Sequence, residues 1–285
     1  MPASSRKKES SRVLFYLYLF ISLIADLMVA KIHQITRSPA ALIRFVLTFA
    51  GIYAICLLCH LLIMILLSVC FDRRSHIVSM NTIFRKASMA TLNLIIKIAR
   101  IKVTVTGEEL LPQDRRFLLV GNHLSAFDPM VAMYYFRKEL LAFVSKKENV
   151  EIPFVGRLML ACGCLPLDRE NVRAAAVTIN DAAELIKSGL ASVGIYPEGK
   201  VNKTDDPLLP FRNGAFKIAK KAKAPIVVTT ITNTNKVRRR WPFRRTDVQV
   251  DILAVIQPEE FQNLSTVQLG NAVWEVMQKH LSELA

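Results

Sequence analysis

The feature that most limits how this chain can fold is an unbroken apolar run from Phe45 to Phe71. Its 27 residues include no formal charge and one histidine, His60. A helix needs about 20 apolar residues to cross the hydrocarbon core of a bilayer, so this run is long enough to cross with some tilt. The sequence therefore predicts a membrane segment near the N-terminus.

A shorter apolar run, from Val13 to Ala30, precedes it and is interrupted only by Asp26. Its length is borderline for a spanning helix, and a basic start before such a run also resembles a signal peptide, although no small-residue cleavage site closes it. Two crossings would form a hairpin with both basic flanks on one side. We therefore expect integral attachment to the cell membrane, with the following domain on the cytoplasmic face. A hairpin that lies half in the interface is the alternative.

The composition agrees with a membrane setting. The 285 residues include 38 Lys and Arg against 23 Asp and Glu, a formal charge of +15, and 52% are hydrophobic. Basic and apolar character together indicate an anionic membrane surface or lipid-like substrate, since nucleic-acid binders are seldom so apolar. The five cysteines lack a regular disulfide or metal spacing. We divide the chain into a disordered basic tail (1–12), two membrane-anchoring helices (13–71) and an α/β domain (72–285).

The α/β domain is indicated by strand and helix patterns that alternate. Apolar residues at helical spacing, with basic partners such as Arg85 and Lys86, predict an amphipathic helix within 72–100. Strands are expected at 101–106, 116–121, 141–145, 164–167, 192–196, 225–230 and 247–256. Helices are expected at 129–141, 154–161, 171–188, 214–222 and 265–281. This alternation predicts a mixed central sheet flanked by helices.

One strand-to-helix loop carries an unusual pair, His123 and Asp128, directly before Pro129. Five residues apart on one helix, the two side chains would diverge by roughly 140°, so they meet only if the chain turns. Asp128 before a proline fits a helix N-cap followed by a first-turn proline. A carboxylate beside one imidazole nitrogen fixes the tautomer and leaves the other nitrogen to accept a proton. The pair is a candidate base and orienting acid; an ordinary loop hydrogen bond is the alternative.

Two later loops also follow predicted strands and carry polar residues. One ends in Asp168-Arg169, and the other contains the segment 196–200, Tyr-Pro-Glu-Gly-Lys. Alone, the first is compatible with a surface ion pair and the second with an ordinary turn. Because α/β sheets bind ligands at the carboxyl ends of their strands, we expect the three loops to meet. A base, an acid and several cations at one edge would suit deprotonation of a hydroxyl and binding of a phosphate.

In this order the motifs resemble those of the glycerolphosphate acyltransferase superfamily, most closely the 1-acyl-glycerol-3-phosphate acyltransferases. The four family blocks are matched, within residues 80–256, by Asn122-His123 with Asp128, by Gly163 with Asp168-Arg169, by Tyr196-Pro197-Glu198-Gly199 and by Pro225-Ile226-Val227. The resemblance implies the family's mixed α/β fold. It also implies acyl transfer from a thioester, acyl-CoA or acyl carrier protein, to the free hydroxyl of lysophosphatidic acid, giving phosphatidic acid. No metal, other cofactor or nucleic acid is implied.

The resemblance also assigns roles to residues. His123 would be the general base, held by Asp128. The residues carried over as binders of the glycerol phosphate are Arg169, Glu198 and Gly199. The family commonly has Thr-Arg-Ser after its Glu-Gly pair, but Val201 stands here where that arginine is expected. Lys200 or Lys203 could make that phosphate contact instead, although a lysine lacks the two-pronged geometry of an arginine. Arg212 is expected as a further substrate-binding cation.

Other functions stay open. Within acyl transfer, the acceptor could be glycerol 3-phosphate or another lysophospholipid. A non-enzymatic, membrane-anchored module for anionic lipid or nucleic acid would use the arginine and aromatic run at 238–245, which is equally compatible with a solvated loop. A metallohydrolase would use His123 and Asp128 as ligands, but no third and fourth ligand stands at metal spacing.

Overall fold

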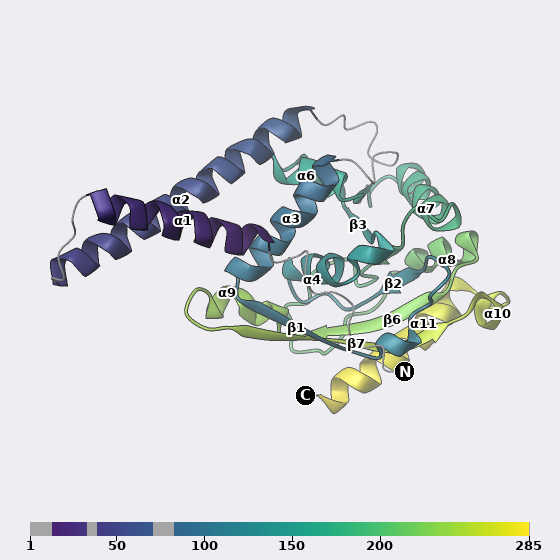
Figure 1. Cartoon of the computed structure of the whole chain (residues 1–285). Helices are drawn as coiled ribbons and strands as arrows, with labels where there is room; N and C mark the ends of the chain where they lie inside the picture. Colours follow the sequence, from purple (N-terminus) through teal and green to yellow (C-terminus); the bar gives the residue numbers. More distant parts are fainter. Residues whose placement is uncertain (1–12, 33–38, 71–82, 285) are drawn as a thin grey trace.

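The computed structural model describes residues 13–32, 39–70 and 83–284, and two long helices form a hairpin at its N-terminal end (Figure 1). Helix α1 spans Val13–Ile32 and α2 spans Pro39–Cys70. The second helix begins six residues before the apolar run at Phe45, because a proline fits the first turn of a helix. By length and composition both helices could cross a membrane. The predicted basic tail, residues 1–12, lies outside the described residues.

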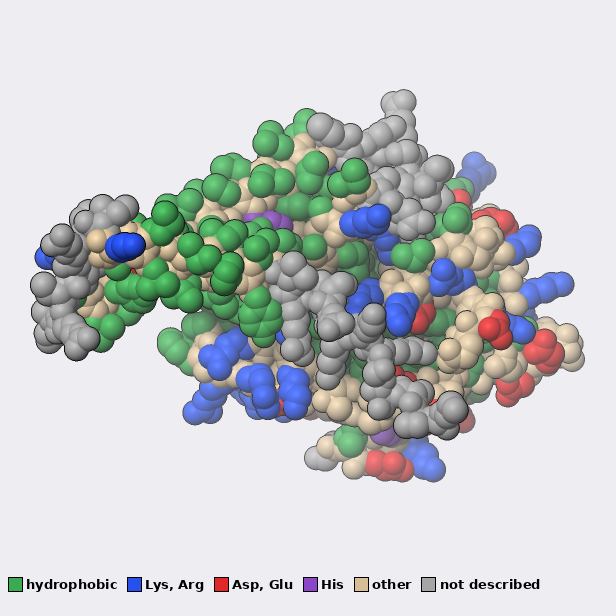
Figure 2. Space-filling view, in the orientation of Figure 1, with side chains coloured by type: hydrophobic (Ala, Val, Ile, Leu, Met, Phe, Trp, Pro, Cys, Tyr) green, Lys and Arg blue, Asp and Glu red, His purple; other side chains and the backbone are tan. Residues whose placement is uncertain are grey.

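Several polar side chains of the hairpin are buried or half-buried between helices, whereas many of its apolar side chains are exposed. The Tyr18 hydroxyl bonds Nδ1 of His60 at 2.8 Å, and Nε2 of His60 bonds the hydroxyl of Thr91 at 3.0 Å. Asp26 is buried and accepts a hydrogen bond from Thr48. Figure 2 shows the outside of the hairpin as a nearly continuous apolar surface. Such an arrangement suits lipid, where polar groups must be satisfied inside the protein.

Helix α3, Ile83–Ile98, joins the hairpin to the α/β domain, and it contacts both α1 and α2. It confirms the amphipathic helix expected within 72–100, of which residues 72–82 lie outside the described part. The pattern had predicted that Arg85 lies on the basic face of this helix, and this prediction is wrong. Arg85 is buried, and its guanidinium donates to the carbonyl of Cys162 at 2.5 Å. This contact ties α3 to the domain.

A seven-stranded sheet forms the centre of the domain, with the order β1-β7-β6-β2-β5-β3-β4. The strands are β1 Ile101–Thr106, β2 Leu118–Val120, β3 Ala142–Lys146, β4 Leu165–Leu167, β5 Val193–Ile195, β6 Ile226–Thr232 and β7 Thr246–Ile256. Neighbours are parallel except β6 and β7, which are antiparallel. The predicted mixed sheet is therefore confirmed, and the expected strands lie where the sequence placed them to within about two residues.

Helices cover both faces of this sheet (Figure 1). They are α4 Phe127–Tyr135, α5 Lys147–Glu151, α6 Val155–Ala161, α7 Val172–Lys187, α8 Lys217–Ala222, α9 Val237–Arg240, α10 Pro258–Phe261 and α11 Thr266–Glu283. Short 3-10 turns are η3 Glu108–Leu110, η4 Arg137–Glu139, η5 Asn213–Phe216 and η6 Thr234–Lys236. The helices α5, α9 and α10 were not predicted, because one turn is too short to show an apolar period.

The central strands β2, β5 and β6 are buried on both faces, as expected of parallel strands between helix layers. Val120 and Val193 are 0% exposed and pack in one apolar cluster with α7, α8 and α11. The opposite face carries Leu119 and Val227, which cluster with residues of α3 and α4. Because helices cover both faces of the sheet, a site can form only at the ends of the strands. There the loops after β2 and β5 lie side by side and can form a site.

Candidate active site

The loop between β2 and α4 is fixed to β6 by Asn122, which is 1% exposed. Its side-chain amide donates to the carbonyl of Ile231 at 3.0 Å, and its carbonyl accepts from the Ile231 N–H at 2.7 Å. The asparagine thus continues the backbone pairing between β2 and β6 beyond the strand end. This anchor sets the position of the next residue, His123.

His123 and Asp128 meet across the loop, as predicted. Nδ1 of His123 lies 2.7 Å from Oδ2 of Asp128, whose side chain is fully buried, whereas the imidazole is 18% exposed. The same oxygen accepts the backbone N–H groups of Leu124, at 2.6 Å, and Ser125, at 2.8 Å. The hydroxyls of Thr234 and, at 3.4 Å, of Ser125 donate to its other oxygen, so five donors reach this carboxylate. They hold a buried charge and fix the direction in which it presents itself to the imidazole.

Asp128 is not the helix N-cap that the sequence suggested. Ala126 occupies that position, and Asp128 lies in the first turn of α4. Its carboxylate turns back over the loop because the loop supplies N–H donors there. That turn brings the acid to the histidine.

Thr234 is a site residue that sequence reasoning missed. It belongs to η6, after β6, and lies 106 positions from Asp128 along the chain. No local pattern marks it. Ser125, which resembles a candidate nucleophile, has a loop role instead: its Oγ accepts the N–H of Phe127 at 3.1 Å and lies 3.4 Å from Asp128.

Glu198, in the loop after β5, braces the histidine loop from the other side. Its Oε1 accepts the N–H of His123 at 2.7 Å, and its Oε2 accepts the N–H of Leu209 at 3.0 Å. Burial raises the pKa of Glu198, although these two hydrogen bonds oppose the rise. A third link joins the loops, since the N–H of Asn202 donates to the carbonyl of His123 at 2.6 Å. The first and third motif loops therefore form one unit.

Tyr196 forms the floor beneath the imidazole. Its ring stacks on His123 with centroids 4.5 Å apart and planes 8° apart. The Tyr196 ring also stacks on Phe143 of β3, with centroids 5.2 Å apart and planes 26° apart. Burial raises the pKa of Tyr196 well above its ordinary value, so the phenol stays neutral. The aromatic pair restricts the plane in which His123 can rotate.

Of the predicted cations, the structure brings Arg169 and Arg212 near each other. Burial, and then the charge of Arg212, lower the pKa of Arg169, which places the two guanidinium groups in one field. Arg212 also lies against Gly199, at whose position a Cβ would come 2.9 Å from the Arg212 Nε. Gly199 has φ +74°, so glycine suits both its backbone and this approach. Within the described chain neither arginine has an ion-pair partner.

Asp168 does not pair with its neighbour Arg169. It accepts from Lys147 Nζ at 2.8 Å and from the N–H groups of Glu170 and Asn171, and the Lys147 bond is the main cause of its lowered pKa. Arg169 is thus left to the site. Lys200 and Lys203 are exposed on the loop that follows Gly199.

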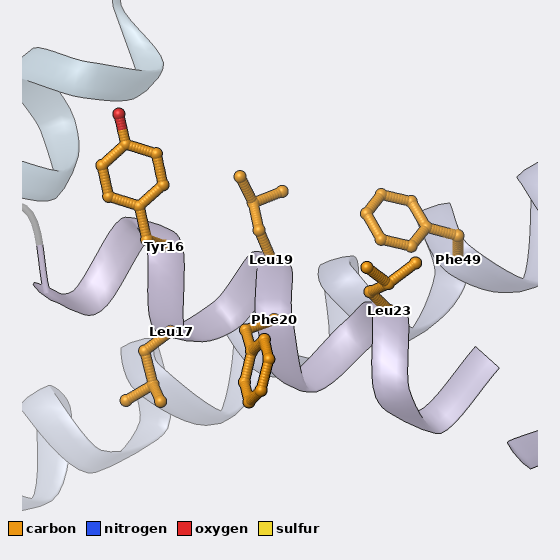
Figure 3. Close-up of a pocket in the computed structure, with 6 residues that line it drawn as sticks. All are labelled: Tyr16, Leu17, Leu19, Phe20, Leu23 and Phe49. Carbon is orange, nitrogen blue, oxygen red and sulfur yellow. The ribbon is translucent and has the colours of Figure 1, made fainter. Parts of the chain in front are cut away.

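An open apolar groove of about 700 Å³ lies on the hairpin, away from these loops. It is lined by Tyr16, Leu17, Leu19, Phe20, Leu23 and Phe49. In Figure 3, Leu19 and Leu23 point to the same side as Phe49, whereas Leu17 and Phe20 point away from it. Its lining belongs to α1 and α2 alone, so this groove is separate from the loop that carries His123 and Asp128.

The arrangement suits base-assisted attack by a hydroxyl. Nδ1 of His123 is held by Asp128, and no hydrogen bond from the described residues occupies Nε2, so that nitrogen can take a proton. In the same part of the chain, no three His, Cys, Asp or Glu side chains are grouped to hold a metal ion. The donor set that a metallohydrolase would use is therefore lacking among the residues described.

Comparisons with known proteins agree with the motifs. Residues 102–232 match a family model described as Acyltransferase. A 1-acyl-sn-glycerol-3-phosphate acyltransferase of Haemophilus influenzae is 32% identical over 183 residues, which cover 62% of this chain and 75% of that protein. A Borreliella burgdorferi protein of the same name is 32% identical over 146 residues, or 51% of this chain and 57% of that protein. The crystal structure of the Thermotoga maritima 1-acyl-sn-glycerophosphate (LPA) acyltransferase, PlsC, is 26% identical, with a TM-score of 0.54, and the match covers 78% of this chain and 95% of that one.

Proposed function

Because this chain belongs to the 1-acyl-sn-glycerol-3-phosphate acyltransferase family, we propose that it transfers a fatty acyl group from an acyl thioester to lysophosphatidic acid, giving phosphatidic acid. The observation that carries the proposal is the buried Asp128 carboxylate on Nδ1 of His123, whose Nε2 receives no hydrogen bond from the described residues. With it go the exposed Arg169 and Arg212, neither of which forms an ion pair within the described chain. A hydroxyl acceptor needs a base such as His123, and its phosphate needs cations such as the two arginines.

The proposed chemistry begins with the acceptor hydroxyl. Nε2 of His123 takes its proton as the oxygen attacks the thioester carbonyl. Asp128 stabilises the imidazolium that forms, because it already accepts the hydrogen bond of Nδ1. The new C–O bond replaces the C–S bond, and the imidazolium returns the proton to the leaving thiolate. No covalent acyl-enzyme is required, which agrees with the loop role of the Ser125 hydroxyl.

The phosphate is proposed to bind at Arg169 and Arg212. Val201 stands where the family has an arginine, and Arg212 is proposed to take over the role of that arginine. Arg212 lies against Gly199, and its charge acts on Arg169. A guanidinium offers the two-pronged geometry that a lysine lacks. Lys200 and Lys203 are proposed to add positive charge on the loop that follows Gly199. Glu198, with both oxygens bonded to backbone N–H groups, supports the loop.

The hairpin is proposed to hold the domain at the membrane where the acceptor and product reside. Its two helices are apolar and long enough to cross, and basic flanks favour a cytoplasmic catalytic domain. The donor is proposed to be acyl-CoA or acyl-acyl carrier protein, both of which carry the thioester that this chemistry needs. No metal or other cofactor takes part in the proposed reaction.

A substrate panel tests the proposal. The purified full chain, in phospholipid nanodiscs, would receive long-chain acyl-CoA or acyl-acyl carrier protein with lysophosphatidic acid, glycerol 3-phosphate or lysophosphatidylcholine. We expect thiol release and phosphatidic acid, measured by mass spectrometry, with lysophosphatidic acid and one donor. Faster turnover of another acceptor would replace the proposed substrate. The absence of turnover with every donor and acceptor would reject acyl transfer as the function.

A further inference from the structure

A cluster of arginines lies outside the candidate site, on α9 and the turn that leads to β7. We call residues 237–245 the arginine loop. Its nine residues carry five arginines, Arg238, Arg239, Arg240, Arg244 and Arg245, and no acidic side chain. Two aromatic side chains stand among them, Trp241 with 51% and Phe243 with 86% of its surface exposed. Exposed aromatic side chains between arginines are unusual for a merely solvated loop, because the hydration of apolar surface is unfavourable.

The charge of the loop is mostly not neutralised by the protein. Arg245 pairs with Asp247 at 3.0 Å. Across the described ranges 13–32, 39–70 and 83–284, the other four arginines form no ion pair. Three of them, Arg238, Arg239 and Arg244, are exposed. The loop therefore presents a concentrated positive charge that an external anion can meet.

The loop is held in place, which distinguishes it from a free tail. The indole N–H of Trp241 donates to the carbonyl of Ile98 at 2.9 Å. The guanidinium of Arg100 donates to the carbonyls of Pro242 and Phe243, each at 3.2 Å. These bonds fasten the loop to the C-terminal end of α3. Since α3 contacts α1 and α2, the loop has a fixed position relative to the membrane hairpin.

That position places basic and apolar surfaces on one side of the molecule. In Figure 1, α9 lies at the side of the domain from which the hairpin extends. In Figure 2, a group of Lys and Arg side chains gathers directly below the apolar hairpin. A bilayer that receives the hairpin would bring its headgroups toward this side. Phosphates would then face the arginines, and Phe243 would meet the boundary between headgroups and acyl chains.

We propose that the arginine loop is a second membrane contact, which binds the anionic phospholipid headgroups of the bilayer that holds the hairpin. Guanidinium groups bind phosphate in a bidentate manner, and aromatic side chains favour the interface. The contact goes beyond acyl transfer: it sets the orientation of the domain on the membrane, independently of His123. A basic residue near an anionic surface contributes about a fivefold preference at moderate salt. Three exposed arginines together should contribute on the order of a hundredfold.

Trp241 gives a native reporter for the test. The chain has two tryptophans, so Trp274→Phe leaves Trp241 as the only indole. This full chain would be reconstituted in vesicles of phosphatidylcholine, with or without about one third phosphatidylglycerol, that carry acyl chains brominated near the headgroup. Quenching of Trp241 fluorescence measures how closely the loop approaches the bilayer. The charge-removing variant is Arg238→Gln/Arg239→Gln/Arg244→Gln.

We expect strong quenching in anionic vesicles, weak quenching in neutral ones and loss of the difference in the triple variant. The matched control removes three exposed cations elsewhere, Arg173→Gln/Lys187→Gln/Lys279→Gln, and should keep the difference. Equal quenching in neutral and anionic vesicles would overturn the proposal. So would a short RNA or DNA that competes for the loop more strongly than soluble phosphatidylglycerol of short chain length, since the surface would then be a nucleic-acid site.

Discussion

The two ends of the candidate site differ in how their polar groups are satisfied. At the catalytic end, Asp128 is fully buried and accepts from two backbone N–H groups, from a threonine hydroxyl and from His123. At the proposed binding end, Arg169 and Arg212 are exposed, and within the described chain neither forms an ion pair. In the proposed function, one end is complete before substrate arrives, whereas the other is completed by it.

The difference follows from what each end has to do. A base must keep one tautomer and one orientation through the reaction, so its acid is fixed by several donors at once. A phosphate grip must release its product, and cations that remain partly in water bind an anion without burying a charge permanently. Substitutions at the first end should therefore lower kcat, and those at the second should raise KM.

The largest effect is expected at His123. His123→Ala removes the proton acceptor and should lower kcat by about 10³–10⁴-fold, the upper part of the range for general bases. Initial rates of thiol release measure it. The matched control is His280→Ala, because His280 also contacts an aspartate, Asp251, at 3.2 Å, but on α11. Full turnover by His123→Ala would show that another group takes the proton.

A somewhat smaller loss is expected for Asp128→Asn. The amide retains the shape of the acid but cannot stabilise an imidazolium, and it allows the wrong tautomer of His123, so kcat should fall by about 10³-fold with KM little changed. Ser125→Ala, which alters the same loop without touching the Nδ1 contact, should retain most activity. A rise in KM with kcat unchanged would contradict the orienting role of the acid.

At the binding end, Arg212→Ala should raise the KM for lysophosphatidic acid by roughly 10–100-fold and change kcat by much less, since one charged hydrogen-bonding partner of the phosphate is lost. Arg212→Lys should recover only part of this affinity, because an ammonium lacks the planar fork. Saturation kinetics on the three proteins measure it. The comparison would break if Val201→Arg lowered KM in the wild type while Arg212→Ala left KM unchanged.

Glu198, which accepts hydrogen bonds from the backbone of His123 and Leu209, gives a pH test of stability. Burial raises its pKa in the folded chain above the ordinary value of 4.5. Its contribution to stability is therefore fully present below pH 4.5 and is lost as the pH rises through the raised pKa. The melting temperature of the wild type minus that of Glu198→Gln should accordingly be larger at pH 4 than at pH 8. Thermal melts of both proteins in nanodiscs provide the measurement, and a difference that grows with pH would contradict the assignment.

The smallest effect is expected at Tyr196. Its stacking on His123 predicts that Tyr196→Leu lowers kcat by up to about tenfold, as befits an aromatic contact of roughly 0.5–1.5 kcal/mol. Tyr196→Phe keeps the ring and should stay within about threefold of the wild type. If both variants behaved alike, the stack would not position the imidazole.

Much of the architecture could be predicted because it depends on local patterns. The apolar runs indicated the hairpin, and β-branched stretches indicated the strands; β1 was expected at the same six residues that it occupies. The motif residues at the ends of β2 and β5 indicated the site, because parallel strands place their carboxyl ends at one edge. Short helices such as α5 and α9 lack a full period, and the burial of Arg85 depends on a partner, Cys162, 77 residues away.

By itself, the sequence determined the two long apolar helices, the α/β class and the pairing of His123 with Asp128, since each depends on residues close together in the chain. Only the tertiary structure decided which distant groups complete the site. Thr234 reaches Asp128 from the end of β6, and Arg212 reaches Gly199 from the segment before η5. The physical reason is that such contacts depend on the order of strands in the sheet, and that order is set by packing of the whole domain rather than by any local period.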